Sequence, residues 1–156
     1  MSEEKPEKMG TKQILEAALK DAIRSSNDVS KRTIRMILAN IKLSEVEKGS
    51  SLDETEIIKI LQKDIKIHNE TIRDAEKAGR VDLIHSSQAE IAILETFLPK
   101  QLSESELKEL VLSTIQEIGA VGPADMGKVM KNLLPKIQDR ALNDVVSKTV
   151  REMLNR

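Results

Sequence analysis

The fold is decided by the stretch Gly122-Pro-Ala-Asp-Met-Gly-Lys-Val-Met130, which fits two structures that cannot both be present. Gly122 and Gly127-Lys128 have the G-x-x-x-x-G-K spacing of a loop that cradles phosphate between a strand and a helix. Such a loop would make the protein a nucleotide enzyme with a β-sheet. The same residues also suit the first turn of a helix in an all-α binding module.

Three features of the sequence argue against the phosphate loop. The Ser or Thr that would hold Mg²⁺ after the lysine is replaced by Val129. Pro123 lacks one of the backbone N–H donors that such a loop directs at phosphate. The preceding segment, Ser103 to Ile118, has the apolar spacing of a helix, and no convincing strand is found elsewhere in the chain. We therefore expect no bound nucleotide.

Composition limits the remaining possibilities. The chain of 156 residues can form one ordinary domain or two small ones, and its net charge of −1 requires any nucleic-acid site to be a local patch. The absence of cysteine excludes disulfides and thiolate zinc sites, and it fits a reducing compartment, so we expect a cytoplasmic location. Phe97 is the only aromatic residue, so RNA would have to be bound through its shape and its phosphates.

The ends of the chain carry no signal for a membrane. No apolar run approaches the ~20 residues of a membrane span, so no membrane partner is expected. Residues 1–10 are charged and contain Pro6, and they lack the apolar core of a signal peptide and the acid-poor character of a transit peptide. We expect these residues to form a flexible tail.

Helical apolar spacing along nearly the whole chain predicts an all-α fold in two domains, residues 11–98 and 99–156. The first domain should be a bundle of about four helices. Their expected limits are a start near Thr11, an N-cap at Ser30 with an end at Lys48-Gly49, a span from Asp53 to Gly79, and a span from Val81 to Leu98. Pro99 then breaks the pattern.

The second domain should contain three helices. A capping box at Ser103 and Glu106 starts the first, which should stop at Gly119. Pro135 is expected to kink or end the second, and Asn143 to cap the third. Three methionines could line a pliable groove, but at helical spacing they are more often core residues, and we expect them to pack inward: Met126, Met130 and Met153.

Charge is distributed unevenly along the chain. Residues 101–122 contain four glutamates and one lysine, whereas residues 123–156 contain seven basic residues and four carboxylates. A second basic cluster, formed by Lys31, Arg32 and Arg35, opens the second helix. On composition alone, both basic clusters also fit ordinary solvated helix surface.

The chain contains no defensible catalytic or metal-binding constellation. Its two histidines, His68 and His85, belong to different predicted helices and do not have the spacing of a metal pair. His68 follows the apolar stripe of its helix, which favours a packed imidazole over a catalytic base. We expect no cofactor and no metal.

Five stretches of the chain, taken in order, carry a family resemblance: Thr33–Ala39, Glu76–Leu83, Ala89–Ser103, Ala124–Met130 and Pro135-Lys136. They resemble the YqeY family of small two-domain helical proteins, which is related to the tail of GatB, a subunit of the tRNA-dependent Asp/Glu amidotransferase. The resemblance extends over most of the chain, and its most specific part is Ala89–Ser103.

The resemblance implies an all-α fold whose C-terminal three-helix domain is like the GatB tail, which is implicated in holding tRNA. We therefore expect a non-catalytic accessory module that interacts with tRNA. One alternative is a module that docks on an amidotransferase or a synthetase. The other is the parent activity, a carbon–nitrogen ligase with glutamine as amido-N-donor, although the glutaminase and kinase parts are not in this chain.

The expected contact with tRNA lies around the start of the sixth helix. Lys128 belongs to the first turn, where N–H groups and the helix dipole favour an anion. Gly127 would let a phosphate or a neighbouring helix approach closely, and Lys131 follows one turn later. Lys136 and Arg140 extend the patch. These five residues are the predicted nucleic-acid site.

Overall fold

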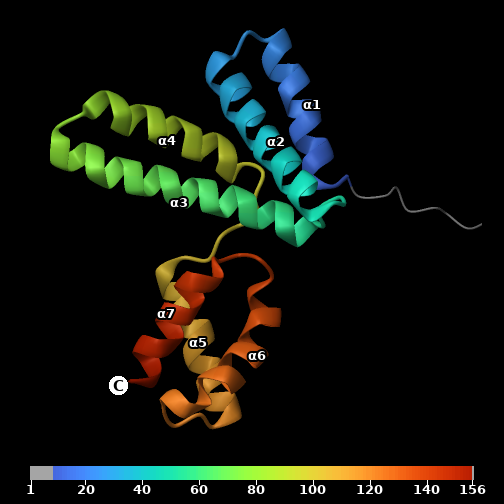
Figure 1. Ribbon diagram of the computed structural model, residues 1–156. Coiled ribbons are helices and arrows are strands. Elements are labelled where there is room, and N and C mark those ends of the chain that lie inside the picture. Colours follow the sequence, from blue (N-terminus) through green and yellow to red (C-terminus); the bar gives the residue numbers. More distant parts are fainter. Residues whose placement is uncertain (1–8, 156) are drawn as a thin grey trace, which may run out of the picture. The chain divides into compact units, whose positions relative to one another are not determined.

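Residues 9–155 are described by the computed structural model, and they form seven α-helices and one 3₁₀ turn without any strand (Figure 1). The all-α fold predicted from the apolar spacing is confirmed. Residues 1–8 and 156 lie outside the described part, so most of the expected flexible tail is not covered. Met9 and Gly10 have no regular secondary structure.

The chain divides between Leu98 and Pro99 into two compact units. α4 ends at Glu95, and the next three residues form tight turns in which each N–H donates to the carbonyl three residues earlier. Pro99 follows, and it has no N–H with which to continue a helix. The part up to Leu98 is called the N-terminal unit below, and Pro99–Arg156 the C-terminal unit.

Four helices form the N-terminal unit as two hairpins (Figure 1). They are α1 (Thr11–Arg24), α2 (Asp28–Lys48), α3 (Glu54–Ala78) and α4 (Val81–Glu95). α1 packs along α2, α3 packs along α4, and α2 contacts both helices of the second hairpin. The core of this unit consists of buried aliphatic side chains from all four helices, namely Leu15, Ile34, Ile37, Ile41, Ile57, Leu61 and Leu94.

The ends of α3 are made by groups close together in the sequence. The Asp53 carboxylate accepts the Glu56 N–H, and the Glu56 carboxylate accepts the Asp53 N–H, both at 2.8 Å. At its C-terminus, Gly79 has a φ of 68°, a left-handed conformation that glycine adopts without strain. Both ends lie where the sequence predicts them.

The start of α2 differs from the prediction. Asn27, not Ser30, is the N-cap, because the Asn27 side-chain oxygen accepts the Ser30 N–H at 3.1 Å. Both residue types cap helices well. An N-cap side chain accepts a hydrogen bond from the backbone N–H two or three residues later. Ser30 lies three residues after Asn27, so its N–H is the donor and Ser30 is not the cap.

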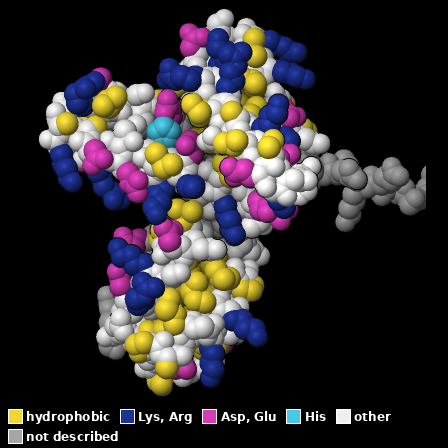
Figure 2. All heavy atoms as spheres, in the orientation of Figure 1, with side chains coloured by type: hydrophobic (Ala, Val, Ile, Leu, Met, Phe, Trp, Pro, Cys, Tyr) yellow, Lys and Arg dark blue, Asp and Glu magenta, His cyan; other side chains and the backbone are white. Residues whose placement is uncertain are grey.

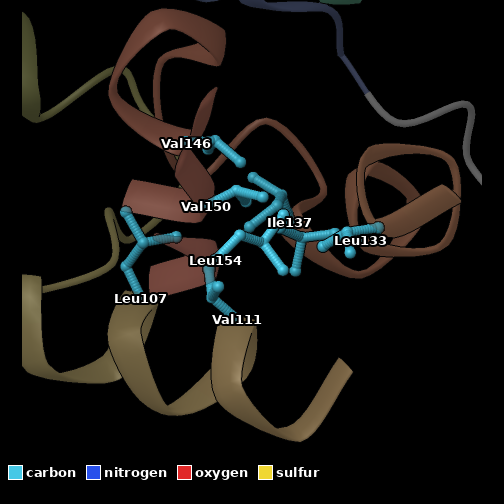
Figure 3. Close-up of a cluster of buried hydrophobic side chains, with 8 residues drawn as sticks. Leu107, Val111, Leu133, Ile137, Val146, Val150 and Leu154 are labelled. Atoms are coloured by element: carbon cyan, nitrogen blue, oxygen red, sulfur yellow. The ribbon is translucent and has the colours of Figure 1, made fainter. Parts of the chain in front are cut away.

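Three helices form the C-terminal unit: α5 (Glu104–Ile118), α6 (Met126–Ile137) and α7 (Asn143–Leu154). The short turn η1 (Pro123–Asp125) leads directly into α6. Side chains from all three helices point toward one another in the core (Figure 3), which comprises Leu107, Val111, Val129, Leu133, Ile137, Val146, Val150 and Leu154. The three methionines expected to pack inward are partly buried against this core.

Two predicted details of the C-terminal unit are compared with the structure here. Of the kink or end expected at Pro135, the end does not occur there, because α6 continues to Ile137. Pro135 is exposed, and a proline there removes one hydrogen bond on a side of the helix that water reaches. Asn143 is not the cap of α7: Leu142 occupies the N-cap position without a side-chain hydrogen bond, and Asn143 is the first helical residue.

Candidate nucleic-acid interface

The segment before α6 uses its own polar groups internally. The Asp125 N–H donates to the Gly122 carbonyl at 3.0 Å, and the Asp125 carboxylate accepts the Val121 N–H at 3.0 Å. The Met126 N–H donates to the Pro123 carbonyl. A phosphate approaching along the helix axis would therefore meet a carboxylate and N–H groups that already have acceptors. The anion-binding helix terminus expected here is weaker than the sequence suggests.

The outer side of α6 is open at Gly127. A Cβ added to Gly127 would have no heavy atom within 4 Å, apart from its own helix and chain neighbours. The glycine therefore does not serve to let another helix of this unit pack closely, which was one of the two roles considered. The backbone remains accessible to a large group arriving from solvent.

Lys128 and Lys131 are the two free cations of this surface. Both are exposed, and within the described part of the chain neither forms an ion pair or a hydrogen bond through its ammonium group. They are three residues apart on one helix, so their side chains are neighbours on the same face. Together with Gly127 they form an outward patch, called the α6 lysine face below.

Lys136 is directed toward α5 instead. Its Nζ lies 2.5 Å from the Glu117 carboxylate and 3.4 Å from the Thr114 hydroxyl. The ion pair joins α6 to α5 across the surface of the C-terminal unit. Lys136 can therefore contribute to binding an anion only by giving up this partner.

Arg140 binds the backbone of the first residues of the C-terminal unit. Its Nε donates to the Lys100 carbonyl at 2.7 Å, and its own carbonyl accepts the Leu102 N–H at 2.8 Å. Arg140 is partly buried by these contacts. The structure thus brings three of the five predicted site residues to one exposed face and gives the other two structural contacts.

Lys136 and Arg140 meet along a shallow groove of 430 Å³ between α5 and the end of α6, which Glu106 and Glu109 also line. Its charge is mixed, because two cations oppose two carboxylates. The Ser103 N–H, with smaller contributions from Lys100 and Arg140, holds the pKa of Glu106 below its usual range. The groove therefore lacks the uniform positive potential that would attract a polyanion.

The second basic cluster is also divided by its contacts. Lys31 pairs with Asp28 at 3.3 Å, and Arg32 pairs with Glu90 at 3.3 Å. Arg35 is exposed and has no such partner in residues 9–155. Sequence proximity therefore does not place these three cations in one free patch.

A charged cluster that the sequence analysis missed surrounds His68. The His68 Nε2 lies 3.4 Å from the Asp64 carboxylate and 3.2 Å from the Glu90 carboxylate, and Arg32 joins the other Glu90 oxygen. Burial raises the pKa of the Asp64 carboxyl. The spacing of four residues between Asp64 and His68 was the available signal. The approach of Glu90 from α4 required the tertiary structure.

The described residues contain no group of three or more His, Cys, Asp or Glu side chains placed to hold a metal ion. No helix formed by residues 9–155 is long and apolar enough to cross a membrane.

Comparison with protein families gives one match that spans nearly the whole chain. The family described as "Yqey-like protein" matches residues 12–154, which include all seven helices except the first residue of α1. The chain belongs to the YqeY family. The matched residues lie in both compact units.

Three similar proteins are each named "Altered inheritance of mitochondria protein 41, mitochondrial". The relative from Pyrenophora tritici-repentis is 33% identical over 90% of this chain and 78% of its own length. Those from Clavispora lusitaniae and Lachancea thermotolerans are 32% and 30% identical over 68% and 70% of this chain. The chain spans 63% and 60% of the lengths of these two relatives.

The names of these relatives contradict the expected cytoplasmic location. All three place the relative in the mitochondrion. The expectation rested on the absence of cysteine, which indicates a reducing environment without naming the compartment. That prediction is therefore wrong.

Proposed function

We propose that this YqeY protein is a non-catalytic accessory module that binds tRNA, with the α6 lysine face as its main point of contact. The observation that carries the proposal is that Lys128 and Lys131 are exposed, adjacent and without acidic partners in the described structure. Two cations in this arrangement can contact successive phosphates of one strand.

Several properties of the face favour a phosphate backbone over bases. Phe97, the sole aromatic residue, is partly buried against the core of the N-terminal unit, so it is poorly placed to stack on a base. Gly127 leaves the helix backbone accessible beside the lysines. Contacts of this kind recognise the shape and charge of a folded RNA and carry little sequence information.

Lys136 and Arg140, the other two residues of the predicted site, are expected to contribute less to RNA binding. Lys136 and Arg140 already bind Glu117 and the Lys100 carbonyl. A phosphate would have to compete with these partners. We propose that they support the C-terminal unit and add to RNA binding only through the general positive potential.

The alternative of a protein-docking surface on α5 has less support. Its acidic residues are largely engaged: Glu104 pairs with Lys108 at 3.0 Å, Glu106 completes the capping box, and Glu117 pairs with Lys136. Among the α5 glutamates, Glu109 is the carboxylate left available for a partner in the described contacts. We propose no ligase reaction for this chain alone.

The test is filter binding of the full chain to bulk tRNA over a range of salt concentrations. The variant Lys128→Glu with Lys131→Glu should weaken binding by about tenfold or more and reduce the salt dependence by roughly two counterions. The matched control is Lys148→Glu with Arg151→Glu, which changes the same charge at the same spacing on the exposed side of α7.

The control pair should have a clearly smaller effect. Equal losses from both pairs would show that only net charge matters and would remove the role of the α6 lysine face. Binding that survives the α6 substitutions, or that ignores salt, would exclude the proposed contact altogether. Circular dichroism of each variant establishes that the helices are retained.

A further inference from the structure

α2 is apolar on two opposite faces. Ile34, Ile37 and Ile41 are buried in the core of the N-terminal unit. Met36 and Leu43 belong to the other side of the helix, because a shift of two residues turns the direction of a side chain by roughly 200°. They are 58% and 60% exposed. The folded unit thus leaves one apolar face of α2 uncovered.

The exposed face has the spacing of a coiled-coil seam. Met36, Ala39, Leu43 and Val46 follow one another at intervals of three, four and three residues, which is the a-d-a-d pattern of helices that pack side by side. Val46 is 70% exposed, and Ala39 is also exposed. Single exposed apolar residues are ordinary on protein surfaces, but a regular row over about three helical turns is a feature of interaction surfaces. These four residues are called the α2 seam.

Cations follow one edge of the α2 seam. Arg35 and Lys42 are seven residues apart and directly precede Met36 and Leu43, so they occupy the flanking positions that select a partner helix in coiled coils. Neither forms an ion pair within residues 9–155. Hydrophobic and basic side chains lie next to each other over the α1–α2 hairpin in Figure 2. The opposite edge is less charged, with Asn40 and Glu47.

We propose that the α2 seam docks an amphipathic helix of a partner protein, and that this helix carries acidic residues beside its apolar stripe. The apolar stripe covers Met36, Leu43 and Val46, while its carboxylates meet Arg35 and Lys42. The proposal goes beyond tRNA binding and concerns the other compact unit, so each can fail without the other.

The chemistry of the seam favours this occupant over RNA and over a second copy of the chain. Phosphates would pair with the two cations but would leave three exposed apolar side chains without a partner. In a second copy, an antiparallel arrangement sets the basic edges against each other, and a parallel one offers Glu47 as the sole acidic partner for Lys42. A helix with an acidic edge would cover the apolar row of the seam and also place carboxylates beside Arg35 and Lys42.

The experiment uses a synthetic helical peptide of about three heptads, with Leu at the a and d positions and Glu at e and g. Its twin has Lys in place of each Glu. Fluorescence anisotropy measures binding of each labelled peptide to the full chain. The Glu peptide should bind at least about tenfold more tightly than the Lys peptide, because only its charges complement the basic edge. Failure of the Glu peptide to bind, or equal binding by both, would overturn the proposal.

Variants locate the binding surface. Leu43→Glu should weaken binding of the Glu peptide by about tenfold or more, and Arg35→Glu with Lys42→Glu should shift preference toward the Lys peptide. Val81→Glu is the matched control, because Val81 is a comparably exposed apolar residue on α4, 57% exposed and outside the seam. Binding unaffected by Leu43→Glu, or equally weakened by Val81→Glu, would contradict the assignment.

Two further measurements test whether the seam binds a second copy of the chain or tRNA instead. Sedimentation of the chain alone should show a monomer, whereas a dimer that Leu43→Glu dissociates would mean that the seam pairs with its own copy. Bulk tRNA should not displace the Glu peptide. Displacement by tRNA, removed by Arg35→Glu with Lys42→Glu, would identify the surface as a nucleic-acid site and overturn the proposal.

Discussion

α2 and α6 both present free cations to solvent, but different side chains surround the charge. Beside Arg35 and Lys42 on α2 lie three large apolar side chains that are 58–70% exposed. Beside Lys128 and Lys131 on α6 lie small or polar residues, and the exposed large apolar residue of that helix, Leu134, reaches 38%. Each helix thus presents two free cations, but only those of α2 lie beside strongly exposed apolar side chains.

The difference teaches that a basic cluster must be interpreted together with its neighbours. A phosphate needs cations and an open approach, and it gains nothing from exposed methyl and methylene groups. A protein helix gains mainly from covering those groups, while the charges select which helix binds. For this reason we assign the two faces to different kinds of partner.

The largest expected effect contrasts a buried leucine with an exposed one. Leu133→Ala empties a fully buried position in the C-terminal core and should lower the free energy of unfolding by about 2–5 kcal/mol. Leu43→Ala should change it by less than ~0.5 kcal/mol, because the seam is exposed. Urea unfolding followed by far-UV circular dichroism measures both. A large loss for Leu43→Ala would show that α2 has a covering partner inside the chain.

A smaller effect is expected at Gly127. Since a Cβ there meets nothing within 4 Å and the position is helical, Gly127→Ala should raise the free energy of unfolding by about 0.5–1 kcal/mol. Thermal unfolding measures the gain, and filter binding measures any loss of tRNA affinity. Unchanged affinity would mean that the bound RNA stays clear of the backbone, and reduced affinity would support close approach.

The smallest effect concerns the cluster formed by Asp64, His68 and Glu90, in which Arg32 pairs with Glu90. Burial raises the pKa of Asp64, the neighbouring His68 opposes this rise, and Glu90 adds to it. Because the pKa is higher in the folded state than in the unfolded state, the fold gains stability as the pH falls through the folded pKa of Asp64. Asp64→Asn should remove this gain.

Urea unfolding of the wild type and Asp64→Asn from neutral to acid pH tests the sign. The difference in unfolding free energy should move in favour of the wild type as the pH falls. Asp74→Asn, an exposed carboxylate on the same helix, is the control and should show no such trend. A difference that moves the other way would mean that the ion pair with His68 outweighs burial.

Much of the fold could be predicted because its signals are short in range. The capping boxes at Asp53 and Ser103 involve residues three apart, and Gly49, Gly79 and Gly119 end three helices in left-handed conformations. The errors were also local: where two suitable caps competed, as Asn27 and Ser30 did, composition alone did not choose between them.

The candidate site was harder to predict, because its residues differ in contacts with distant parts of the chain. Lys128, Lys131 and Lys136 look alike in the sequence. Yet Lys136 meets Glu117, which is 19 residues away, and the other two meet no acid in the described structure. Arg140 likewise binds a carbonyl 40 residues earlier.

The sequence by itself determined that this protein is helical, where most of its helices end, and that the glycine–lysine pair lies in the first turn of a helix. These properties depend on groups within about four residues of one another. Only the tertiary structure decided which cations are free and which apolar face of α2 remains uncovered. Burial and ion pairing depend on which helices pack together, and that is settled by contacts between residues far apart in the chain.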